Sequence, residues 1–144
     1  MERSSAGRWL LTSQAVIIGL GGFLADWNDS HLLNPRWPPH ARFHDAQCIT
    51  LGLGLALLSL CFLWRRSADA RQALSFAVLL QVLFWASLLG SFLFPGVALT
   101  DPDHADRNPV VVGVPINQVT MGLLCLVLIV LGAWLEQRRL SRAP

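Results

Sequence analysis

Charge is scarce in this sequence. Only 14% of its 144 residues are charged, and all 11 basic residues are arginine because lysine is absent. An ordinary soluble domain carries about 25% charged residues, which keep its surface in water. Since 53% of the residues are also hydrophobic, the composition excludes an ordinary soluble domain and indicates a membrane protein.

Four long apolar segments contain no charged residue: 9–25, 47–64, 74–94 and 116–135. Each is close to the roughly 20 residues that a helix needs to cross the hydrocarbon core. Backbone groups cannot stay unpaired in lipid, so these segments must be helical. Consecutive prolines favour a start of the second helix at Pro39. We therefore predict one all-α domain over residues 1–144, a four-helix transmembrane bundle with spans at about 9–25, 39–64, 74–94 and 116–135.

The arginines predict the orientation of this bundle. Eight of the 11 lie in the N-terminal tail, in residues 65–71 or in the C-terminal tail. The positive-inside rule then places both termini in the cytoplasm and the connectors 26–38 and 96–115 outside. This predicts a multi-pass protein of the cell membrane, in contact with the lipid bilayer. The basic balance follows from this topology and gives no reason to propose nucleic acid as a partner.

Two further absences limit the possible functions. The three cysteines, Cys48, Cys61 and Cys125, lie inside spans at different depths, so no disulfide framework is predicted. A transporter is the least supported class, because ionisable residues at membrane depth usually mark a transport pathway and the apolar segments have none.

Polar chemistry is concentrated in residues 26–47. This stretch holds three of the four histidines, three of the nine acids and two of the six tryptophans. A simple connector between two spans needs none of these groups. We therefore expect a site at the extracytoplasmic end of the bundle.

A metal site is one reading of this stretch. His40 and His44 are four residues apart, so a helix places both imidazoles on one face about 6 Å apart, and Gln47 extends that face. Imidazole nitrogens at this spacing can bind one divalent transition metal. His31 and His104 are the candidates for the remaining ligands.

Acid–base chemistry on a small lipid-like molecule is the second reading. Histidine titrates near neutral pH, so His40 or His44 can move a proton while Asp26 orients the ring. Further candidate ligand contacts are Arg42, Gln47, Trp37 and Asn28, with Gln81 of the third span as a pocket wall. The preferred hypothesis is an enzyme or binding protein that uses one of these two chemistries, and the sequence leaves open whether it is catalytic.

Two alternatives need no ligand. Histidine, tryptophan, arginine and aspartate all suit a membrane interface, so the stretch can be a structural cap with Asp26–Arg42 or Asp45–Arg36 ion pairs. The protein can also be a noncatalytic subunit or scaffold whose outer loops dock a membrane protein partner or a second copy.

The stretch also carries a recognisable pattern. It reads Asp-Trp-Asn-x-x-His from Asp26, followed by Asn-Pro-x-Trp-Pro-Pro-His-Ala-Arg-Phe-His from Asn34. This pattern resembles the signature of a family of small four-helix membrane proteins of unknown function. The resemblance implies location in a membrane and nothing about activity.

Overall fold

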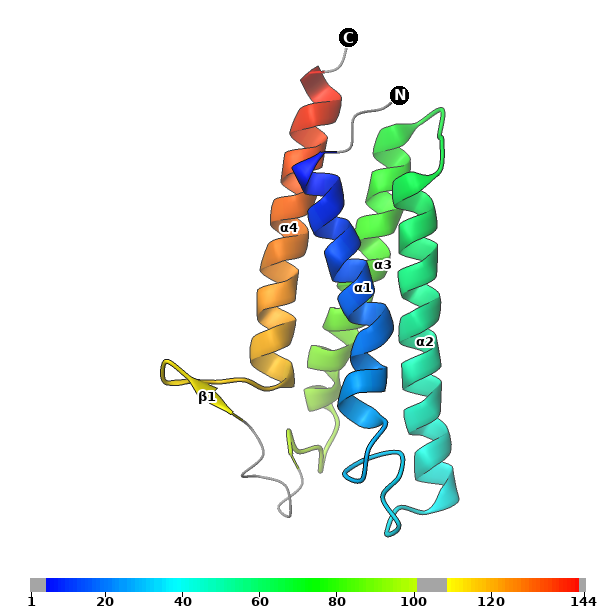
Figure 1. Ribbon diagram of the computed structural model, residues 1–144, viewed down its shortest axis with the longest axis vertical. Coiled ribbons are helices and arrows are strands. Elements are labelled where there is room, and N and C mark those ends of the chain that lie inside the picture. Colours follow the sequence, from blue (N-terminus) through cyan, green and yellow to red (C-terminus); the bar gives the residue numbers. More distant parts are fainter. Residues whose placement is uncertain (1–4, 101–108, 143–144) are drawn as a thin grey trace.

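The computed structural model describes residues 5–100 and 109–142, which form a bundle of four long antiparallel helices (Figure 1). The helices are α1 (Ala6–Asp26), α2 (Pro39–Trp64), α3 (Ala70–Gly90) and α4 (Gln118–Arg142), and a short 3-10 helix η1 (Ser91–Leu93) follows α3. Each helix packs against two neighbours around a ring, α1 against α2 and α4, and α3 against the same two. The predicted all-α four-helix bundle is confirmed.

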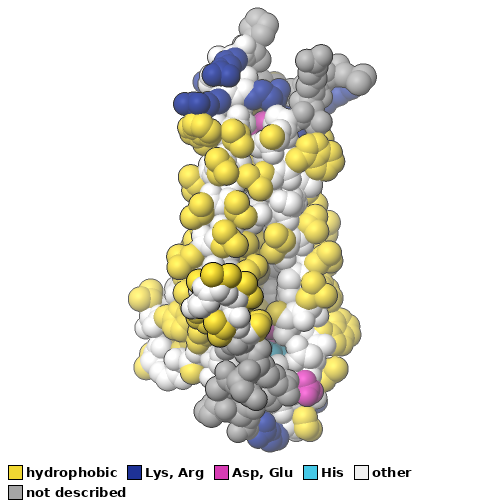
Figure 2. Space-filling model, turned by 60° about the vertical axis from the view of Figure 1, so that its left-hand side comes forward, with side chains coloured by type: hydrophobic (Ala, Val, Ile, Leu, Met, Phe, Trp, Pro, Cys, Tyr) yellow, Lys and Arg dark blue, Asp and Glu magenta, His cyan; other side chains and the backbone are white. Residues whose placement is uncertain are grey.

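The two ends of the bundle differ. One end, here called the terminal end, carries the start of α1, the end of α4 and the α2–α3 connector (Figure 1). The other, the distal end, carries the connector 27–38, η1 and the start of α4 (Figure 1). All four helices are long and apolar enough to cross a membrane, and hydrophobic side chains cover the middle of the bundle, with basic side chains gathered at the terminal end (Figure 2). This is the architecture of a multi-pass membrane protein.

Capping residues set where the helices begin. The side chains of Ser5, Asp69 and Asn117 each accept a hydrogen bond from a backbone N–H in the first turn of α1, α3 and α4, respectively. Pro39, which has no N–H to satisfy, is the first residue of α2. Helices α3 and α4 thus begin at residues 70 and 118, where their caps lie, instead of at the apolar boundaries 74 and 116.

A small hairpin precedes α4. Its strands are β1 (Val110–Val111) and β2 (Val114–Pro115), which pair antiparallel. The turn residues Val112 and Gly113 both have positive φ, 51° and 77°, the combination found in tight two-residue hairpin turns. Valine rarely adopts this conformation, and the Val112 side chain is 97% exposed. The hairpin projects sideways from the distal end of the bundle (Figure 1).

Helices α1 and α4 approach closely at the terminal end. A Cβ atom added to Gly7 would lie 2.6 Å from the carbonyl oxygen of Gly132 and 2.7 Å from the backbone nitrogen of Glu136. A Cβ on Gly132 would in turn lie 3.0 Å from Cγ of Leu11. Small residues at such a crossing let helix backbones pack directly, which is how helices associate in lipid.

Candidate functional site

The connector 27–38 is a compact series of turns. The backbone oxygen of Asp26 accepts from the N–H groups of Asn28 and Leu32, at 2.9 and 3.0 Å. Asn34 is buried, and its backbone oxygen accepts from Nη2 of Arg42 on α2 at 2.7 Å. The predicted ligand contact Arg42 therefore ties α2 to the connector. These contacts give the connector a stable shape that positions the side chains described next.

Asp26, the last residue of α1, faces His31 of the connector. Oδ1 of Asp26 lies 3.8 Å from Nε2 of His31, and the two side chains are 21% and 34% exposed. The ring of Trp37 contacts the ring of His31 edge-on, with 5.5 Å between the centroids. Asp26, His31 and Trp37 were all predicted as site residues, and the fold brings these three together.

A chain of hydrogen bonds determines the tautomer of His31. Oδ1 of Asn28 accepts from the N–H and from the hydroxyl of Ser30, at 2.8 and 2.6 Å. Because the Ser30 hydroxyl hydrogen goes to Asn28, the 2.8 Å contact between Oγ of Ser30 and Nδ1 of His31 requires an Nδ1–H donor. Nε2 of His31 then presents either a lone pair or one further proton to Asp26. The pair thus places an imidazole and a carboxylate within ion-pair range, at a separation longer than a direct hydrogen bond.

Asp26 also lines a cavity in the distal half of the bundle. The cavity has a volume of about 260 Å³ and lies between α1, α2 and α3. Its apolar wall is formed by Ile18, Ile49, Phe84 and Leu88, and its polar groups are Asp26, Cys48, Ser87 and Ser91. Ligand pockets for drug-sized molecules span about 300–1,000 Å³, so this cavity matches a small molecule with an apolar body and one polar group.

Asp45 on α2 adds a second acid beside this pair. It interacts electrostatically with both Asp26 and His31, and its Oδ2 is buried without a hydrogen-bond partner among residues 5–100 and 109–142. From the sequence, Asp45 was predicted only as an ion-pair partner of Arg36. Residues three and four further along α2, Cys48 and Ile49, line the cavity, but this placement follows from the fold and no sequence signal indicated it.

His40 and His44 form a separate pair on the surface of α2. Their Nε2 atoms lie 3.1 Å apart, and both side chains are exposed. Nδ1 of His44 lies 3.2 Å from Oε1 of Gln47. None of these three residues lines the cavity. The predicted histidine cluster is therefore divided into two pairs, Asp26–His31 and His40–His44.

A metal centre with three or more protein ligands is not formed by the described part of the chain. Within residues 5–100 and 109–142, no three histidine, cysteine, aspartate or glutamate side chains converge in a way that could hold an ion. His104, the fourth predicted metal ligand, lies outside the described residues.

Gln81 has a packing role in the middle of the bundle. Its Nε2 donates to the backbone oxygen of Leu11 on α1 at 3.0 Å and to Oγ of Ser59 on α2 at 2.8 Å. Ser59 donates onward to the backbone oxygen of Ala77. Gln81 therefore joins three helices, and it is not among the residues that line the cavity.

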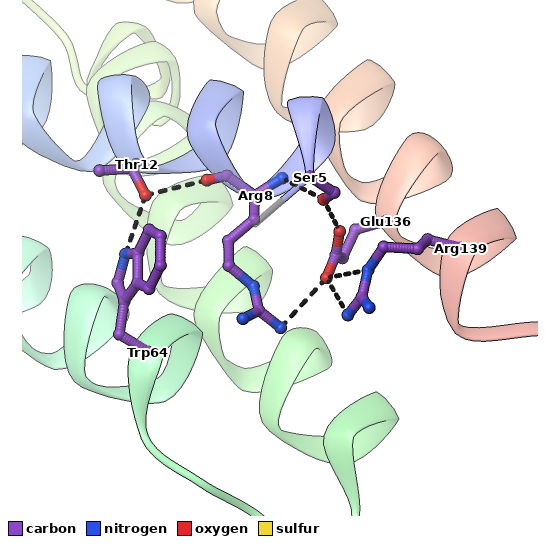
Figure 3. A network of polar contacts seen from close by, with 6 residues as sticks. All are labelled: Ser5, Arg8, Thr12, Trp64, Glu136 and Arg139. Carbon is purple, nitrogen blue, oxygen red and sulfur yellow. Dashed lines mark hydrogen bonds and ion pairs between the residues drawn. The ribbon is translucent and has the colours of Figure 1, made fainter. Parts of the chain in front are cut away.

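A second polar cluster lies at the terminal end and was missed by the sequence reading. The carboxylate of Glu136 on α4 is 2% exposed and accepts from Nη2 of Arg139 at 2.8 Å, with Nη2 of Arg8 on α1 at 3.2 Å. The hydroxyl of Ser5 also donates to it (Figure 3). Two arginines and one hydroxyl neutralise and solvate this buried acid, so the cluster joins the first and last helices.

The comparisons with known proteins identify a family but no activity. The model of a family described as a family of unknown function (DUF6640) matches residues 10–143. No curated protein and no solved structure matches the chain. The match extends over all four helices and includes both the cavity and the connector 27–38. The chain therefore belongs to this family of unknown function, DUF6640.

Proposed function

We propose that the protein binds a small amphiphilic molecule in the distal cavity and exchanges a proton with it through Asp26 and His31. The observation that carries this proposal is the double role of Asp26, which lines the cavity and faces Nε2 of His31. The apolar wall accommodates the body of the ligand, and its polar group lies beside Asp26. A small lipid-like molecule from the surrounding bilayer has this chemistry.

The charges around the cavity favour a ligand that donates hydrogen bonds. Asp26 and Asp45 are both acceptors when ionised. The hydroxyls of Ser87 and Ser91 line the cavity and donate to backbone oxygens of α3, which leaves their lone pairs to accept from a ligand. Arg42 binds the carbonyl of Asn34. A hydroxyl or amine headgroup is therefore favoured over a carboxylate or phosphate.

The Asp26–His31 pair supplies the acid–base step. With Nδ1–H bonded to Ser30, Nε2 accepts the proton that Asp26 takes from the ligand, or returns one through Asp26, once a side-chain rotation has shortened their 3.8 Å separation to hydrogen-bond distance. The step moves one proton and needs no oxidant or reductant. This differs from the prediction that His40 or His44 acts as the base, since both lie outside the cavity lining. Proton exchange thus depends on Asp26 and His31, whereas binding depends on both Asp26 and the apolar wall of the cavity.

The experiment is an inventory of the lipid-like molecules bound to protein purified in mild detergent. Cys48 lines the cavity and is exposed, so Cys48→Phe fills it. We expect Cys48→Phe to lower the bound amphiphile at least about ten-fold. Asp26→Asn should lower it by about ten-fold or more, because a hydrogen bond to a charged group contributes about 1.5–3 kcal/mol.

The matched control is Cys61→Phe, an exposed cysteine on the same helix that does not line the cavity. It should keep the wild-type ligand content. The proposal is overturned when wild-type protein carries no amphiphile, or when Cys48→Phe and Cys61→Phe carry equal amounts.

The hairpin favours a second candidate function, that of a noncatalytic subunit. Val110, Val111 and Val114 are all at least half exposed, and no charged residue lies between Pro109 and Gln118. On this hypothesis the hairpin docks a membrane protein partner or a second copy. The native mass of the purified protein tests this hypothesis. Docking is supported over the cavity function when the wild type carries a stoichiometric partner or forms a dimer, and when the double variant Val111→Thr with Val114→Thr loses it while its ligand content stays unchanged.

A further inference from the structure

We propose that His40 and His44 form a binding site for one divalent transition metal ion on the surface of α2, independent of the cavity. Metal–imidazole bonds are about 2.0–2.1 Å long. Two nitrogens on one ion at tetrahedral or octahedral angles are therefore about 2.9–3.4 Å apart. The Nε2 atoms of His40 and His44 are 3.1 Å apart, so an ion fits without any movement of the helix backbone.

Gln47 prepares His44 for this role. Oε1 of Gln47 accepts from Nδ1–H of His44 at 3.2 Å, which leaves the lone pair of Nε2 directed toward His40. Outer partners of this kind orient most metal-binding histidines and raise the basicity of the ligating nitrogen. Gln47 is one turn from His44 on the same face of the helix. Helix α2 therefore positions both ligands, His40 and His44, and also Gln47, which orients His44.

The proton balance of binding is simple. In the metal-free protein, Nε2–H of His40 donates to the Nε2 lone pair of His44, which completes the 3.1 Å contact. When the ion binds, the proton of His40 moves from Nε2 to Nδ1 through water, and both Nε2 lone pairs coordinate. Both rings remain neutral, so no net proton is released. The ring exposure provides the necessary access for water and for the ion.

The chemistry selects the class of ion. Neutral imidazole suits Zn²⁺, Cu²⁺ and Ni²⁺, whereas Mg²⁺ and Ca²⁺ take oxygen ligands. Two protein ligands leave the remaining coordination positions to water. Cu²⁺ has the highest affinity among the divalent first-row ions and reports its nitrogen ligands in its electron paramagnetic resonance spectrum, so it is the appropriate probe.

The test is a titration of tag-free, full-length protein in detergent with Cu²⁺ alone, followed by the same spectroscopy. We expect one bound ion with two equatorial nitrogens. His40→Ala and His44→Ala should each weaken binding by more than ten-fold. Gln47→Ala should weaken it by about 10–100-fold, the usual cost of removing an outer partner, and Gln47→Glu should restore it.

The matched control is His31→Ala, which removes a histidine of the same distal end and should leave Cu²⁺ binding unchanged. Because both site side chains are exposed, the variants should keep the wild-type circular dichroism and melting temperature. The proposal is overturned by the absence of stoichiometric Cu²⁺ in the wild type, or by binding that survives in the double variant. Cu²⁺ binding tests the His40–His44 site, and the amphiphile content tests the cavity. We expect Cys48→Phe to change the second and not the first, so failure of the metal site and failure of the cavity function are distinguishable.

Discussion

At the scale of single residues, the buried or half-buried acids at the two ends of the bundle have different roles, one in the proposed site and one in stability. Asp26 lies on a cavity wall and has one histidine opposite, at 3.8 Å, which leaves it free to bind and react. Glu136 is surrounded by Ser5, Arg8 and Arg139 (Figure 3). A carboxylate with three donors is a structural group. The geometry of the partners, and not the residue type, separates the two.

The Glu136 cluster leads to a stability prediction. Glu136→Gln keeps the side-chain shape but removes the negative charge that Glu136 places beside Arg8 and Arg139, and breaking one partner of a buried ion pair costs about 3–5 kcal/mol. We expect the free energy of unfolding in detergent to fall by about 3 kcal/mol. Arg138→Gln, an exposed position that stacks on Trp134, is the control and should change little. Equal stabilities of the two variants would contradict the structural role of Glu136.

The sequence could indicate only part of this residue-scale picture. Asp26 was predicted as a site residue because it ends an apolar span beside the histidines. Glu136 was missed because the apolar run ends at Leu135, although Ile129, Gly132 and Glu136 share one buried face at helical spacing. The division of the histidines into two pairs depends on the turns of residues 27–38, and no periodicity describes such turns.

At the scale of helices, the α1–α4 crossing depends on the absence of a side chain. Gly7→Ala would place a methyl group 2.6 Å from a backbone oxygen and 2.7 Å from a backbone nitrogen of α4, and backbone cannot move aside as a flexible side chain can. Overpacking of this kind costs about 1–3 kcal/mol.

We therefore expect Gly7→Ala to lower the melting temperature, measured by circular dichroism in detergent. Gly54→Ala on α2 is the matched control, because a Cβ there meets nothing within 4 Å, and alanine favours a helix over glycine by about 1 kcal/mol. The two substitutions should shift the melting temperature in opposite directions. A destabilised Gly54→Ala together with a neutral Gly7→Ala would show that the crossing does not control stability.

Hydropathy indicates which segments form membrane helices, whereas capping residues determine where each helix begins. This difference explains which features of the elements could be predicted. Apolar length identified four helices, and α2 has the predicted bounds 39–64 because Pro39 marks its start. Helix α3 begins earlier than the predicted 74, at Ala70, since Asp69 caps it. The hairpin before α4 was not predicted, because Val112 occupies a turn position that glycine, asparagine or aspartate usually takes.

At the scale of the whole molecule, four helices crossing in sequence place both chain ends on one side of a membrane. The arginine distribution predicts that this side is the cytoplasm. In a variant whose three cysteines are replaced by serine, we expect a single cysteine at Arg66 to be labelled by a membrane-impermeant maleimide only in inside-out vesicles. A single cysteine at Val112 should be labelled only in right-side-out vesicles.

Each alternative result of the labelling has a distinct meaning. Exchange of the two patterns would overturn the predicted orientation and leave the bundle intact. Labelling of both positions from one side would contradict the four-span arrangement itself.

The closed ring of helices also has a consequence for biosynthesis. Helix α1 leaves the ribosome before α4, yet α4 is one of its two principal neighbours. Until α4 has been made, the small-residue face of α1 around Gly7 and the guanidinium of Arg8 have no α4 to pack against. Helix α1 is also the least hydrophobic of the four, with a mean hydropathy of 1.3 against 2.0 to 2.2 for the others. We therefore expect α1 to be the least stably inserted of the four helices until α4 arrives to pack against it.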